Sequence, residues 1–210
     1  MSTNCLDNEI HKKWCDEHFQ KKHKEARRKV ELYVQELNSR NLERQGTEFI
    51  RYMESRMKTP QSIMGKLKRK GLSEDFYTAI TNLNDISGVR VVCYCLEEVY
   101  WIVRELRKEE KYSILKEKDY IRKPKRNGYE SYHIVLEVPV KVDRILEIVR
   151  VELQIRTIIM DAWAGMDNRI CYKKAVISEE QSQRLYKYAQ IGRRLDKLIQ
   201  STLNEAKNEC

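Results

Sequence analysis

The sequence lacks any run of about 18 apolar residues, so it predicts no membrane-spanning helix. Residues 1–5 lack the apolar core of a secretory signal. Internal repeats and low-complexity segments are also missing. Six cysteines are present, but their spacing matches no zinc site. Free thiols in a chain without a signal predict a protein of the reducing cytoplasm.

The 210 residues are 41% hydrophobic and 35% charged, which predicts a globular domain with a heavily charged surface. The apolar run at 88–95 excludes a disordered chain, because it must be buried. A net charge of +9 favours polyanionic partners such as nucleotide polyphosphates, RNA or acidic membranes. Lysine-rich helices with solvated faces explain the same surplus equally well.

Hydrophobic periodicity predicts an α+β fold: a mixed β-sheet flanked by helices, with a long helix at each end. Thr59 and Pro60 indicate a helix start, and Gly71 indicates its end. Ser178 and Gln181 form a capping box before the last helix. The predicted helices cover 10–40, 48–57, 60–70, 74–83, 97–109, 158–170 and 179–207, and the predicted strands cover 89–95, 112–115, 132–138 and 145–155.

Two carboxylates are placed where a sheet can expose them. In the strand around 151–156, Glu152 and Gln154 alternate with apolar residues and share one face with Arg156. Asp85 precedes the strand at 89–95, in a turn with Gly88. A solvated sheet face and a turn cap are the ordinary explanations. Together, the two carboxylates also suit a Mg²⁺ site completed by substrate phosphates, while the histidines at 11, 18 and 23 are expected to be exposed.

Cations gather at the start of the helix that begins at Pro60. Arg56 and Lys58 lie just before it, and on one of its faces lie Ser62, Lys66 and Arg69 or Lys70. Free amide donors and the positive end of the helix dipole make this a candidate polyphosphate site. An exposed basic helix is the alternative.

A basic loop runs from Lys125 into Tyr129, with His133 four residues further on. Cations that meet phosphates and a ring that stacks on a base are typical of nucleotide binding. A packed turn aromatic and a structural histidine are the alternatives.

In this order, the motifs resemble the synthetase domain of the RelA/SpoT family, in particular its small single-domain alarmone synthetases. The resemblance spans roughly 47–174 and leaves 1–46 as a basic helical extension and 175–210 as a C-terminal helix. The matching segments are RMKTPQS (56–62) with 69–70, DISGVR (85–90), NGYESYH (127–133), VELQIRT (151–157), Trp163-Ala164 and Tyr172-Lys173.

The resemblance implies a nucleotidyltransferase-like sheet that uses Mg²⁺ to move the β,γ-diphosphate of ATP onto a ribose 3′-hydroxyl. It assigns catalysis and metal binding to Asp85 and Glu152. The implied ATP-binding residues are Arg56, Lys58, Ser62, Lys66, Arg69 and Arg90. The implied acceptor-binding residues are Lys125, Tyr129, His133 and Gln154.

The sequence departs from the family on the acceptor side, at Glu130, where a basic residue is common, and at Met166-Asp167-Asn168. GDP or GTP is the first candidate acceptor, for synthesis of (p)ppGpp. The alternative is a toxin, held by an antitoxin, that modifies the 3′ end of tRNA; the basic helix at 21–29 and Glu130 would suit it. A non-catalytic RNA-binding module is the third hypothesis. No hydrolase domain is expected, and a homo-oligomer is compatible with the long terminal helices.

Overall fold

The computed structural model describes residues 10–171 and 178–208, in which five strands form one sheet in the order β1-β2-β5-β4-β3. The neighbours β2 and β5 are parallel, and the other pairs are antiparallel. The predicted α+β class with a mixed sheet is therefore confirmed. The strands are β1 (Ile50–Met57), β2 (Ser87–Cys93), β3 (Ser113–Asp119), β4 (Tyr132–Val142) and β5 (Ile145–Thr157).

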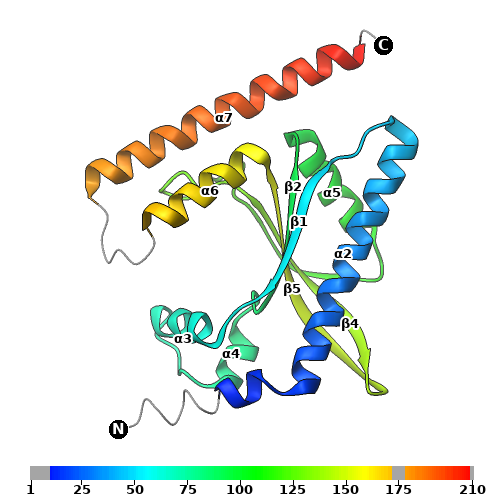
Figure 1. Cartoon of the computed structure of the whole chain (residues 1–210), viewed down its shortest axis with the longest axis vertical. Helices are drawn as coiled ribbons and strands as arrows, with labels where there is room; N and C mark the ends of the chain where they lie inside the picture. The colour runs from blue at the N-terminus through cyan, green and yellow to red at the C-terminus, as the bar shows by residue number, and fades with distance from the viewer. Residues whose placement is uncertain (1–9, 172–177, 209–210) are drawn as a thin grey trace.

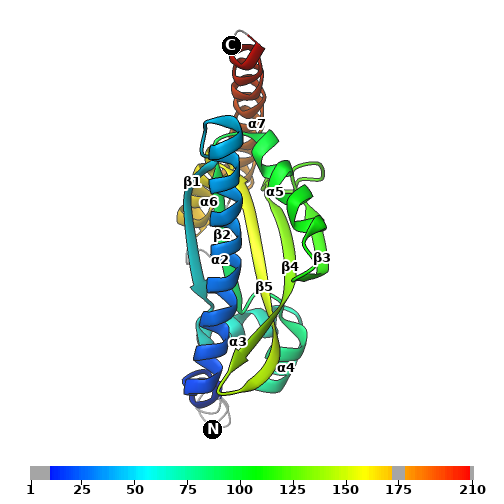
Figure 2. The same ribbon diagram turned by 90° about the vertical axis from the view of Figure 1, so that its right-hand side faces the viewer.

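The helices leave one face of the sheet partly open (Figure 1). Helices α2 (Glu17–Gln45) and α5 (Leu96–Lys108) pack over the other face. Helices α3 (Pro60–Arg69) and α4 (Phe76–Asn82) lie at one end of the molecule. At the opposite end lie α6 (Ile158–Cys171) and α7 (Glu179–Asn208), and α7 extends beyond the sheet (Figure 2). None of the helices in these described ranges is long and apolar enough to cross a membrane.

The main core lies between the sheet and α2. Val30, Val34 and Leu37 recur at helical spacing and are fully buried against alternate strand residues such as Val91 and Leu153. Because side chains alternate along a strand, the residues between these apolar ones point to the opposite face. The packing of α2 therefore decides which face of the sheet is left for polar side chains.

Several local predictions are confirmed. Thr59 caps α3, with its hydroxyl accepting from the Ser62 amide, and Pro60 is the first helical residue. Gly71 follows with φ +67°, a left-handed conformation that glycine adopts without strain. The expected reciprocal cap between Ser178 and Gln181 is present at the start of α7.

The predicted helix at 48–57 is wrong, because Ile50–Met57 is the edge strand β1. It pairs with β2 from Ile50 opposite Cys93 to Met57 opposite Ser87. Its methionines, glutamate and arginines favour helix, and an edge strand shows no clean apolar alternation. Pairing with β2 satisfies the backbone hydrogen-bonding groups of this segment and overrides its local preference for helix.

The predicted helix at 10–40 is interrupted at 15–16 and continues to Gln45. Asp16 caps α2 by accepting from the Phe19 amide at 2.9 Å, which starts a new helix there. The expectation of an exposed His23 is also wrong. It is buried, and its Nδ1 lies 2.8 Å from Ser87 Oγ at the start of β2. The predicted motif at 172–173 lies outside the described residues.

Candidate active site

A cavity of about 860 Å³ lies on the sheet face opposite α2. Strands β1 to β5, α3, the loop before β4 and α6 all contribute to its walls. Its charged wall residues are Arg56, Lys66, Lys70, Arg90, Lys116, Lys118, Lys125 and Arg156, against Asp85, Glu152 and Asp167. This excess of positive charge suits a ligand with several phosphates.

Asp85 lies just before β2 in a cationic corner of the cavity. Lys58 donates to its Oδ2, and Lys66 Nζ donates to the same oxygen at 2.5 Å. Burial by itself raises the pKa of Asp85, but the hydrogen bonds and charges of the two lysines outweigh burial, and the net pKa is lowered. Its Oδ1 is buried without a hydrogen-bond partner among the described residues.

Glu152 lies on β5 opposite Gly88 of the parallel strand β2, which brings it close to Asp85. His133 Nδ1 lies 3.1 Å from its Oε1, and Gln154 Nε2 donates to its Oε2 at 2.7 Å. Burial opposes ionisation, but His133 and Gln154 lower the pKa of Glu152 overall, while the charge of Asp85 works in the opposite direction. Both carboxylates are therefore expected to be ionised at neutral pH.

The residues present fit the implied Mg²⁺. Mg²⁺ is held in many phosphate-transfer sites by one or two carboxylates, with water and substrate oxygens completing its shell. Asp85 Oδ1, buried and unpaired within the described chain, is an oxygen of the required kind. The described residues contain no group of three or more acidic, histidine or cysteine side chains arranged for a metal.

The predicted ATP-binding residues fall into two groups. Arg56, Lys66 and Arg90 line the cavity, and Lys58 contacts it through Asp85. Ser62 and Arg69 are exposed on α3 outside the lining. Lys70, the alternative to Arg69 in the sequence, lines the cavity instead.

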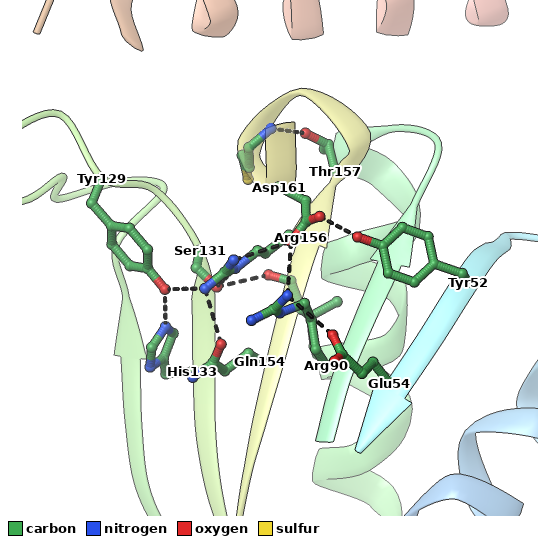
Figure 3. Close-up of polar contacts among 12 residues, drawn as sticks. Tyr52, Glu54, Arg90, Tyr129, Ser131, His133, Gln154, Arg156, Thr157 and Asp161 are labelled. Atoms are coloured by element: carbon green, nitrogen blue, oxygen red, sulfur yellow. Dashed lines mark hydrogen bonds and ion pairs between the residues drawn. The ribbon is translucent and has the colours of Figure 1, made fainter. Parts of the chain in front are cut away.

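Arg56 and Arg90 lie diagonally across β1 and β2, because Arg56 pairs with Gly88 and Glu54 pairs with Arg90. A smaller hollow that also contacts Asp85 and Glu152 lies beside them. Arg90 Nη1 is 3.3 Å from Glu54 and 3.5 Å from Asp161 (Figure 3). Its Nε is buried without a partner among the described residues, so one donor of the guanidinium is unused.

All four predicted acceptor-binding residues line the cavity, and side-chain polar contacts connect Tyr129, His133 and Gln154 to Glu152. His133 Nε2 lies 2.8 Å from Tyr129 Oη, while its Nδ1 faces Glu152. Arg156 Nη2 donates to Tyr129 Oη at 2.7 Å and to Gln154 Oε1 at 2.9 Å (Figure 3). The contacts connect Tyr129 through His133 to Glu152 in an unbroken chain.

The cavity is also lined by residues that the sequence does not predict as site residues. Lys116, Lys118 and Tyr120 line the cavity from β3 and the residue after it, and Arg156 lines it from β5. The first three alternate, which is the signal of one strand face, but the predicted strand ended at 115. Arg156 shares the sheet face of Glu152, as the sequence predicts, but the sequence assigns it no role.

Glu130 does not belong to the cavity wall. Its carboxylate is buried and paired with Arg193 of α7, and it lines a small separate cavity between α6 and α7. Glu130, which the sequence places on the acceptor side, is thus paired within the fold with Arg193. The other departures, Asp167 and Asn168, do line the main cavity.

Comparison with known proteins identifies the class. Residues 55–176 match the family described as the region found in RelA / SpoT proteins. The chain is 38% identical over 148 residues to GTP pyrophosphokinase YwaC of Bacillus subtilis, covering 70% of each. It is 30% identical to GTP pyrophosphokinase YjbM of the same organism, covering 70% of this chain and 69% of the relative. The protein therefore belongs to the RelA/SpoT family.

Solved structures place it near the family's small alarmone synthetases. It matches small alarmone synthetase 1 from Bacillus subtilis, bound to its product pppGpp, with TM-score 0.80 and 26% identity, over 87% of this chain and 93% of that one. It matches small alarmone synthetase 2 from the same organism with TM-score 0.77 and 34% identity, over 87% of this chain and 96% of that one. The nucleotidyltransferase-like fold predicted from the sequence is thereby confirmed.

Proposed function

We propose that the protein is a Mg²⁺-dependent pyrophosphokinase that transfers the β,γ-diphosphate of ATP to the ribose 3′-hydroxyl of GDP or GTP, forming (p)ppGpp. The observation that carries the proposal is that two carboxylates, Asp85 and Glu152, line the same strongly cationic cavity. The relatives named as GTP pyrophosphokinases support it.

Asp85 and Glu152 would hold the metal, which when bound would neutralise phosphate charge and polarise the transferred group. Lys66 and Lys58, already next to Asp85, are placed to contact the donor phosphates. Glu152 also accepts from the incoming 3′-hydroxyl, because its lowered pKa keeps it ionised. Diphosphate transfer depends mainly on positioning and charge neutralisation, and these side chains supply both.

The two nucleotides occupy opposite sides of the carboxylates. The adenine of ATP lies between Arg56 and Arg90 on β1 and β2, where flat cations stack on a base. The guanine of the acceptor stacks on Tyr129, and Lys125, whose Nζ lies 4.3 Å from the Tyr129 ring centre, meets its phosphates.

A guanine nucleotide is favoured over tRNA as acceptor because both features that suggested tRNA have structural explanations. Glu130 is neutralised by Arg193. Several cations of α2 are engaged: Lys22 with Glu147, Arg27 with Ser87 and Lys29 with the carbonyl of Pro139. The helix also covers the sheet face opposite the cavity.

The test is a transfer assay with γ-labelled ATP and Mg²⁺, offering GDP, GTP or deacylated tRNA separately. Label in ppGpp or pppGpp is the expected result. Label on tRNA alone identifies a tRNA-modifying toxin, and no transfer to any acceptor identifies a non-catalytic binding module. Asp85→Asn and Glu152→Gln are expected to lower the rate by at least about 100-fold, as loss of a charge clamp does. Glu43→Gln, an exposed carboxylate on α2, is the matched control.

A further inference from the structure

Helix α7 lies outside the segment that matches the family, which ends at 176, yet it packs on the loop that carries Tyr129. Gly128 has φ +90°, and a Cβ added to it would lie 2.5 Å from Ala189 Cβ. Real side chains do not approach so closely, so helix and loop are in direct contact at this point. Helix α7 therefore packs directly against Gly128, the residue before Tyr129.

The other neighbour, Glu130, is held by the same helix. Its side chain is only 6% exposed, and its carboxylate pairs with the guanidinium of Arg193, which itself keeps about a third of its exposure. Removal of one partner of a buried ion pair leaves an uncompensated charge, so the loop must then rearrange. Burial raises the pKa of Glu130, and the hydrogen bond and charge of Arg193 work against this rise.

The ring of Tyr129 completes the contact. It packs against a cluster formed by Trp163 and Ala164 of α6 with Leu185 and Ala189 of α7. The cluster is tied together by the Trp163 indole N–H, which donates to the carbonyl of Leu185 at 3.0 Å. Helices α6 and α7 therefore contact the ring of Tyr129, and α7 also contacts the residues before and after it. The Tyr129 hydroxyl points into the cavity, where it contacts His133 and Arg156.

We propose that Arg193 is a positioning residue for the acceptor: through its ion pair with Glu130 it sets the Tyr129 ring for stacking on the acceptor base. The proposal rests on the proposed function, because it assumes that Tyr129 contacts the acceptor. The donor residues Arg56, Lys66 and Arg90 lie on β1, α3 and β2, and within the described residues none of them forms a hydrogen bond or ion pair with Arg193. Loss of the ion pair should therefore affect the acceptor and leave ATP binding intact.

The test compares KM for GDP with KM for ATP in Arg193→Met, which keeps much of the side-chain volume and removes the charge. A displacement of about 1 Å in a reacting partner is enough for large losses, so KM for GDP should rise about tenfold or more while KM for ATP stays within about twofold. Arg193→Lys keeps the charge and should recover most of the GDP affinity. Arg184→Met is the control, because Arg184 on the same helix forms an ion pair, within the described residues, only with the exposed Glu180.

Calorimetric titration of the full-length protein with GDP is the second measurement and needs no turnover. Weaker GDP binding in Arg193→Met than in Arg184→Met supports the proposal. Equal changes in KM for ATP and GDP, or unchanged GDP binding, overturn it. If Arg193→Met does not fold, Glu130→Gln removes the buried charge and should raise KM for GDP alone. Absence of transfer by the unmodified protein overturns the proposed function, whereas normal transfer with unaffected variants overturns only the role of Arg193.

Discussion

The carboxylate of Asp196, on α7, is buried where its charged form is disfavoured. It is 1% exposed, and its Oδ2 accepts from Thr157 Oγ1 at 2.9 Å. Its Oδ1 is buried without a partner in the part of the chain that the structure describes. Burial raises the pKa of Asp196 from 3.8 to about 6; the Thr157 hydrogen bond works against this rise, and the nearby charge of Glu130 adds to it.

The sign of the pH effect follows from this rise. Between pH 3.8 and about 6, the folded protein keeps a proton on Asp196 that the unfolded chain has released. The stability that the folded protein gains by keeping this carboxyl protonated is fully present below pH 3.8 and is lost as the pH rises through about 6. A difference of about two pH units at about 1.36 kcal/mol each means that ionised Asp196 costs about 3 kcal/mol at pH 8.

Asp196→Asn removes that cost and keeps an oxygen to accept from Thr157. At pH 8 we expect the free energy of unfolding to rise by about 1–3 kcal/mol, which raises Tm by roughly 3–10 °C in a chain of this size. Near pH 4 the difference should disappear. Thermal unfolding from pH 4 to 8 measures it, with Glu205→Gln, an exposed carboxylate on α7, as control. A Tm difference that does not change with pH, or a less stable variant at pH 8, would refute the assignment of a buried, ionised carboxylate.

Three further substitutions test the packing around the site by urea unfolding. Gly128→Ala should lower stability by about 1–3 kcal/mol, because it places a Cβ on Ala189 at a positive φ; wild-type stability would contradict the close contact. Ser87→Ala leaves buried His23 without its hydroxyl partner and should cost about 1–3 kcal/mol, whereas no loss would show that water replaces the hydroxyl. Leu37→Ala, at a fully buried position of α2, should cost about 2–5 kcal/mol; a loss below 1 kcal/mol would mean that α2 is not part of the main core.

Local patterns were sufficient where the physical cause is itself local. Thr59 and Pro60 mark the start of α3 because a cap and a preset φ act within one turn. The alternation around Glu152 and Gln154 predicts one polar sheet face, because strand geometry alone puts both on the same side. The order of the motifs along the chain was enough for the family, which the comparisons confirm.

Local sequence patterns could not predict the contacts between distant segments. The segment Ile50–Met57 has the local preference of a helix, but it forms a strand because its backbone hydrogen-bonds to the edge of β2. The sequence places Glu130 on the acceptor side, whereas the fold pairs it with Arg193, which is 63 residues away in the chain. Lys116 and Lys118 reach the cavity only because β3 pairs with β4. The sequence by itself determined the caps, the periodicity and the order of the family's motifs. The tertiary structure decided which face of the sheet α2 covers and which charges remain free, because burial and pairing depend on residues far apart in the chain.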